Sequence, residues 1–163
     1  MKTRIKIIFI FSHLMFLVAG TGLGIYILPI LTAQEDISLN EINEVQKKAK
    51  YKGEFSRNQK GSDVFHWAEG ELYVTDNEIA FNGEVAPGPD YKIYLTKEQA
   101  VDKNSFLEIK KEAVMIGELK NFGNFRKNIP NSVNVNDFTT VQIWCERFSK
   151  FIGSAKYRHD FGQ

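Results

Sequence analysis

Thr139-Thr-Val-Gln-Ile-Trp-Cys145 is the clearest β-strand pattern in this chain of 163 residues. The run is rich in β-branched and aromatic residues, which fit the pleated surface of a sheet. Successive side chains of a strand point to opposite faces, so Val141, Ile143 and Cys145 share one face and Trp144 lies on the other. The pattern predicts a strand that ends on the only cysteine of the chain.

Similar runs recur at short intervals on the N-terminal side of this strand, and once after it. Turn residues such as Asn82-Gly83 and Pro87-Gly-Pro-Asp90 separate them. Many short strands at regular spacing predict a mainly β fold, an antiparallel β-sandwich or barrel-like domain. Roughly 110 residues are enough for one such core. The further strands are expected at residues 71–75, 78–81, 91–96, 106–109, 114–116 and 154–157.

The N-terminus predicts a transmembrane helix. No residue from Ile7 to Gln34 carries a formal charge, and three basic residues precede this run. About 20 apolar residues span a bilayer. The positive-inside rule then predicts a single-pass protein with a cytoplasmic N-terminus and an extracytoplasmic domain, either periplasmic or at the cell surface. A cleaved signal peptide ending at Ala33 is the alternative, although its apolar core would be unusually long.

A short amphipathic helix is expected next. Ser38 and Glu41 match a capping box, and Ile37 and Ile42 stand at the positions of a hydrophobic staple. Apolar residues then continue at helical spacing over residues 39–50. The expected organisation is an N-terminal anchor (1–34), a helical stalk (35–52), a β domain (53–157) and a tail (158–163).

Charge and motifs exclude several function classes. The chain carries 21 Lys and Arg against 20 Asp and Glu, without a basic cluster in the β domain. Nucleic acid is therefore not an expected partner, because phosphate binding needs a clustered positive face. Phosphate-binding loops, nucleophile elbows and haem-attachment motifs are lacking as well. The sequence leaves open whether the chain is an enzyme, although the lack of standard catalytic motifs argues against it. No cofactor can be named.

Cys145 is the first candidate site residue. Secreted domains usually pair their cysteines, and a single thiol cannot close a disulfide within its own chain. Between Val and Ile neighbours it can be a small buried hydrophobe. Alternatively, Arg147 on the same face lowers the pKa of the thiol and makes it reactive. Oxidation, a mixed disulfide or a metal bond would then be open to it.

His66 is the second, weaker candidate. A neutral imidazole can assist the deprotonation of Cys145 or join it in binding a metal. A structural hydrogen bond at a strand edge is the simpler role. Asp90 follows Gly88-Pro89, where an aspartate commonly accepts backbone N–H bonds within a turn.

Five short motifs occur in order along the chain: His66-Trp-Ala-Glu-Gly70, Gly88-Pro-Asp-Tyr-Lys-Ile-Tyr-Leu95, Gly117-Glu-Leu-Lys120 with Gly123, Ile129-Pro130, and Val141-Gln-Ile-Trp-Cys145 with Phe148. This series resembles the DM-thirteen domain, also called the electron transfer DM-thirteen domain. The resemblance covers about Gly53 to Tyr157 and departs from many relatives at residues 124–128.

The resemblance implies a compact extracytoplasmic β domain with a role in electron transfer. It implies that Cys145 is the redox-active centre and that a redox partner protein exists. The N-terminal helix adds the lipid bilayer as a partner. The alternative is a non-catalytic binding or adhesion module in which the cysteine only packs.

Overall fold

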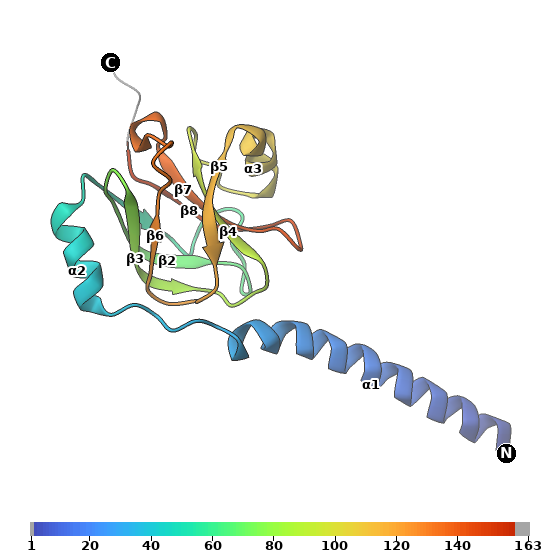
Figure 1. Cartoon of the computed structure of the whole chain (residues 1–163). Coiled ribbons are helices and arrows are strands. Elements are labelled where there is room, and N and C mark those ends of the chain that lie inside the picture. Colours follow the sequence, from blue (N-terminus) through green and yellow to red (C-terminus); the bar gives the residue numbers. More distant parts are fainter. Residues whose placement is uncertain (1, 159–163) are drawn as a thin grey trace.

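Two antiparallel sheets of four strands each form the folded part of the computed structural model, which describes residues 2–158 (Figure 1). The strand orders are β1-β2-β3-β6 and β5-β4-β7-β8. This arrangement confirms the predicted mainly β, sandwich-like fold. The strands are β1 (Tyr51–Phe55), β2 (Ala68–Val74), β3 (Glu78–Val85), β4 (Tyr91–Thr96), β5 (Val114–Leu119), β6 (Phe125–Asn128), β7 (Thr140–Cys145) and β8 (Lys150–Lys156).

The strand expected at residues 106–109 is wrong, because this segment belongs to helix α3 (Lys103–Ile109). Asp102 caps the helix by accepting a 2.9 Å hydrogen bond from the Ser105 N–H. Phe106 then packs 4.8 Å from the Trp144 ring on the outer face of the second sheet. Capping by a residue that precedes the apolar run therefore overrode its strand-like composition. Two 3-10 turns, Lys110–Glu112 and Val135–Asp137, complete the described elements.

The main core lies between the two sheets, and β7 runs through it. Val141, Ile143 and Cys145 belong to this core, whereas Trp144 faces outward into a second cluster beneath α3. The predicted alternation of β7 is therefore confirmed. Every residue of β7 is buried, because one face meets the opposite sheet and the other is covered by a helix.

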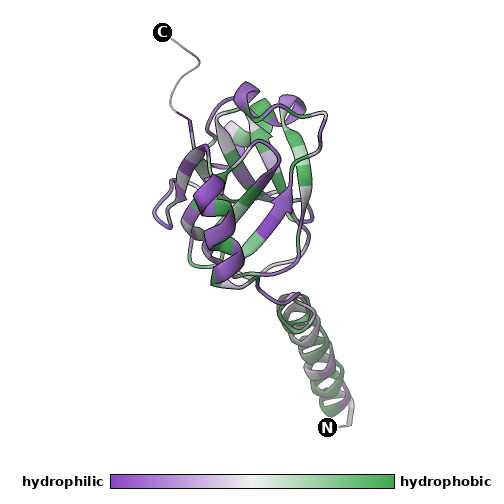
Figure 2. Cartoon of the chain, turned by 60° about the vertical axis from the view of Figure 1, so that its left-hand side comes forward, coloured by the Kyte–Doolittle hydropathy of each residue, from purple (hydrophilic) through white to green (hydrophobic). Residues whose placement is uncertain are grey.

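Helix α2 (Leu39–Lys48) covers the outer face of the first sheet (Figure 1). Its predicted capping box is present, with the Ser38 side chain accepting from the Glu41 N–H. Ile42 and Val45 are buried against Tyr73 and other residues of β2 and β3. Figure 2 shows the remaining, hydrophilic side of the helix turned to solvent. The expected stalk helix thus exists as part of the packed structure.

Helix α1 (Lys2–Leu31) extends away from the sandwich and is apolar along most of its length (Figure 2). Within its segment Thr3–Leu31, a stretch of 18 residues has a mean hydropathy of 2.1, and none of that stretch is buried within the protein. By length and composition it could cross a membrane, as a span or as a signal anchor. Helix α1 is therefore a candidate for anchoring the protein in a lipid bilayer.

One end of the sandwich, here called the α1 end, carries several loops and also receives α1. The strand register places Tyr91 beside both Cys145 and Leu119 at this end. The Gln34 N–H, just after α1, donates to the Lys120 carbonyl at 2.8 Å. The loops at this end are 56–67, 86–90 and 120–124, and the β7–β8 turn 146–149.

The backbone conformation at position 70 requires glycine, so Gly70→Ala should lower the stability of the domain. Its φ of +144° lies where other residues are strained, and an added Cβ would lie 2.4 Å from the Asn82 carbonyl. We expect Gly70→Ala to lower the free energy of unfolding by about 1–3 kcal/mol. Gly117→Ala in β5 is the matched control, because its Cβ would meet only Lys127 Cδ at 3.8 Å. Urea denaturation of both variants measures the difference, and equal midpoints would contradict the argument.

Candidate functional site

Cys145 stands at the last position of β7, at the α1 end. Its side chain is 2 % exposed, and the thiol donates to the Pro89 carbonyl at 3.1 Å. Antiparallel pairing places Tyr91 of β4 directly beside it. The only thiol of the chain therefore lies at the border of the main core, beneath loop 86–90.

Loop 86–90 is tied down over the thiol by its backbone. Asp90 has a φ of +59°, a left-handed conformation that aspartate tolerates better than most residues. Its carbonyl accepts the Glu146 N–H at 3.0 Å, and its carboxylate lies 3.0 Å from Lys92 Nζ. Asp90 thus has the expected turn position, but its carbonyl rather than its side chain accepts the backbone hydrogen bond.

The pKa of the Cys145 thiol is raised, mainly because burial penalises the charged thiolate. The backbone N–H groups of Phe148 and Arg147 act in the opposite direction, while the carboxylates of Asp90 and Glu146 raise the pKa further. The expected lowering of this pKa is therefore wrong. Strand β7 ends at Cys145, and Arg147 lies exposed in the turn that follows the strand.

Tyr91 is a neighbour of the thiol that the sequence did not mark as a candidate site residue. Burial raises the pKa of its phenol, and the neighbouring Cys145 adds to this effect. A Cβ at Gly88 would lie 2.2 Å from the Tyr91 hydroxyl, so glycine makes room for the phenol. The sequence offered one signal for this residue, because Tyr91 directly follows Gly88-Pro-Asp90 at the start of a predicted strand. The structure shows that this strand pairs with β7 and sets Tyr91 beside Cys145.

His66 lies at the same end of the sandwich but is engaged by Asp63. Its Nδ1 lies 2.8 Å from the Asp63 carboxylate. The backbone N–H of each of these two residues also donates to the carbonyl of the other, which forms an isolated β-bridge. Burial opposes ionisation of Asp63, but hydrogen bonds from His66 and the Phe65 N–H leave the pKa of its carboxyl lowered. The hydrogen bond considered as the simpler role for His66 is thus present.

The structure places His66 and Cys145 in separate hydrogen-bond networks. Across residues 2–158, the His, Cys, Asp and Glu side chains form no group of three or more that could hold a metal ion. Joint metal binding by these two residues, or assistance of His66 to the thiol, stays a prediction.

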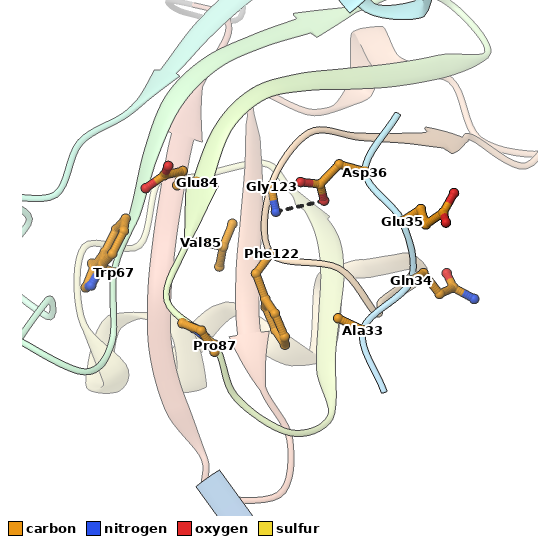
Figure 3. Close-up of a pocket in the computed structure, with 10 residues that line it drawn as sticks. All are labelled: Ala33, Gln34, Glu35, Asp36, Trp67, Glu84, Val85, Pro87, Phe122 and Gly123. Atoms are coloured by element: carbon orange, nitrogen blue, oxygen red, sulfur yellow. Dashed lines mark hydrogen bonds between the residues drawn. The ribbon is translucent and has the colours of Figure 1, made fainter. Parts of the chain in front are cut away.

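A groove of about 590 Å³ lies between the domain and the segment after α1 (Figure 3). We call residues 32–37 the strap. The Asp36 carboxylate accepts hydrogen bonds from the Gly123 N–H at 3.1 Å and from Asn121 Nδ2 at 2.9 Å. Val85, Phe122 and Trp67 line the groove on the domain side. The strap is therefore a docked segment, and sequence reasoning gave no sign of its contacts.

A smaller groove of about 280 Å³ borders the loop that covers the thiol. Leu28 and Pro29 of α1 line one side, and Pro89, Leu119 and Phe122 line the other. The end of α1 thus lies beside the loop above Cys145.

The fit of Gly123 beneath Asp36 predicts the effect of Gly123→Ala on the strap. A Cβ there would lie 2.0 Å from a carboxylate oxygen of Asp36, so the carboxylate would have to move away from Gly123, which breaks its hydrogen bond with the Gly123 N–H. Loss of a charge-assisted bond costs about 1–3 kcal/mol, so we expect roughly tenfold or faster amide exchange at Gln34 and Ile37. Gly117→Ala should leave both rates unchanged. Unaltered exchange in Gly123→Ala would show that the strap does not depend on this contact.

Comparison with known proteins identifies the family of this chain. No curated protein and no solved structure matches the chain significantly. The model of the family described as Electron transfer DM13 matches residues 54–157, which include Cys145 and strands β2 to β8. This match confirms the resemblance seen in the short motifs, and the chain belongs to the Electron transfer DM13 family.

Proposed function

We propose that this protein is a membrane-anchored electron-transfer domain that acts outside the cytoplasm, with Cys145 as its redox-active group. Membership of an electron-transfer family supports the redox role and the existence of a redox partner. The apolar helix α1 supports the anchor, and the basic residues that precede its apolar run support a cytoplasmic N-terminus. In this proposal α1 is retained, and the β domain over residues 53–157 carries the function.

The position of Cys145 is the observation that carries the proposal. The thiol is buried at the edge of the main core, beneath loop 86–90, at the end of the sandwich nearest α1. Tyr91, a neutral phenol, is its neighbour across the strand pair. Cys145 is the only cysteine of the chain, and a cysteine thiol can be oxidised to a sulfenic acid or to a mixed disulfide.

The raised pKa determines how the thiol would react. Cys145 is protonated at neutral pH, so its oxidation must release a proton as well as electrons. A sulfenic acid or a mixed disulfide with a partner would also need space at the sulfur. Loop 86–90 would have to open, which breaks the bonds from Cys145 to Pro89 and from Glu146 to Asp90. Exchange between two thiols of one chain is excluded, because there is no second cysteine.

A binding or adhesion module is the second candidate function. The 2 % exposure and the raised pKa of Cys145 favour it, since inert structural cysteines are buried and protonated. In that case the loops of the α1 end would contact a partner and the thiol would only fill the core.

The raised pKa predicts slow, strongly pH-dependent labelling of the native thiol. The full chain in detergent micelles should react with iodoacetamide at a pH midpoint above that of the same chain unfolded in urea, about 8.5. The folded-state pKa is the higher one, so its contribution to stability is complete below the unfolded value. That contribution is lost as the pH rises through the folded value. Equal midpoints in both states would show that burial does not control this thiol.

The redox proposal predicts an electrochemical signal that depends on Cys145. Film voltammetry of the full chain should give a wave that disappears in Cys145→Ser and persists in His66→Ala, because the imidazole is engaged by Asp63. Circular dichroism of each variant checks that it is folded. A wave that survives Cys145→Ser would place the redox group elsewhere. Absence of a wave in the unmodified chain would favour the binding module.

A further inference from the structure

We propose that the α1 end of the sandwich rests directly on the extracytoplasmic lipid surface, with Val64, Phe65 and Phe148 inserted among the headgroups. This inference rests on the proposed membrane anchor and is independent of the redox chemistry of Cys145. Its occupant is the bilayer that α1 enters. Four features of the described residues support it: the short strap, the length of α1, the exposed loop tips and the way one tip is held.

The strap is too short to hold the domain away from the membrane. Helix α1 ends at Leu31, and the Gln34 N–H is already bonded to the Lys120 carbonyl. Three residues of extended chain reach at most about 10 Å. The Ile37 N–H donates to the Asn124 carbonyl at 3.1 Å, which fixes the strap a second time. The domain therefore sits at the end of α1 without a flexible spacer.

The helix α1 itself also provides no spacer between the membrane and the domain, because the bilayer takes up its length. Its 30 residues extend for about 45 Å, against a hydrocarbon core of about 30 Å. The basic residues at its start belong at the cytoplasmic headgroups, so its final turns reach the opposite headgroup layer. Tyr26 in this last part fits the interfacial position that tyrosine prefers. The docked strap thus begins at or near the level of the headgroups.

Exposed apolar side chains occupy two loop tips at this same end. Val64 is 78 % exposed, Phe65 is 64 % exposed and Phe148 is 48 % exposed. Figure 1 shows the β7–β8 turn, which contains Phe148, projecting on the side of the domain toward which α1 also runs. Scattered exposed apolar residues are ordinary, but here they stand on loop tips beside a membrane anchor. Inserting such side chains among headgroups removes apolar area from water.

The tip that carries Val64 and Phe65 is held in shape before it meets a surface. Asp63 accepts the Phe65 N–H at 2.8 Å and binds His66 Nδ1 at the same distance. The ionised carboxylate therefore closes the turn and leaves both apolar side chains pointing outward. This gives the Asp63–His66 pair a positioning role, in place of a role in the chemistry of Cys145.

The experiment uses the full chain with a fluorescent probe at each tip. Phe65→Cys and Phe148→Cys are labelled with a nitrobenzoxadiazole and reconstituted in phosphatidylcholine vesicles that contain a nitroxide-labelled phosphatidylcholine. Asn131→Cys is the control, because it lies in an exposed loop beyond β6 at the opposite end. The unmodified chain is labelled in parallel, so any signal from Cys145 is subtracted.

Probes at 65 and 148 should be quenched by the nitroxide lipid several-fold more strongly than the probe at 131, and should be protected from aqueous iodide. Quenching at 65 and 148 equal to that at 131 would overturn the proposal. Protection from iodide without lipid quenching would also overturn it, and would indicate a protein occupant such as a second copy. Failure of the chain to enter vesicles would instead reject the anchor. None of these readouts depends on whether Cys145 is redox-active.

Discussion

The antiparallel pairing of β4 with β7 is the constraint from which the geometry of the site follows. It aligns Tyr91 with Cys145, and it forces the chain that precedes β4 to pass over the end of β7. That chain is loop 86–90, whose Pro89 carbonyl accepts the thiol hydrogen bond. A register shift of one residue would turn Cys145 to the opposite face of the sheet, away from the main core.

Burial on both faces makes this pairing rigid and also sets the chemistry of the thiol. The inner face of β7 meets the opposite sheet, and its outer face is covered by α3 through Phe106 and Trp144. A charged thiolate would have little water around it, so the neutral thiol is favoured. The backbone N–H groups of Arg147 and Phe148 show that the β7–β8 turn offsets this penalty in part. Any redox reaction of Cys145 is thereby coupled to proton release and to motion of the covering loop.

The strap connects the site to the membrane. Its hydrogen bonds to loop 120–124 join α1 to the same end of the sandwich that carries the thiol. Orientation of the domain is consequently set by short-range contacts, in contrast to a domain on a long flexible linker. In the proposed arrangement a redox partner would approach Cys145 along the lipid surface, which favours a partner that is itself held at the membrane.

Local patterns in the sequence were sufficient for the sandwich, for β7 with its alternating faces, for the capping box of α2 and for the apolar α1. Each depends on residues within a few positions of one another, so periodicity and capping chemistry reveal them. The five short motifs, taken in order, were likewise sufficient for the family. Strands β1 and β6 were missed, because Lys52 and Glu54 in β1 and Arg126 and Lys127 in β6 hide their apolar pattern.

Other features were decided by contacts between residues far apart in the chain. The segment 106–109 belongs to a helix whose Phe106 packs on Trp144 of the second sheet. The pKa of Cys145 moved upward rather than downward because desolvation depends on every element packed around the sulfur. Docking of the strap depends on Asp36 meeting Gly123 across 87 positions. Sequence spacing reports on neighbours along a helix or strand, whereas solvent exclusion and long-range hydrogen bonds exist only once the sheets have closed over one another.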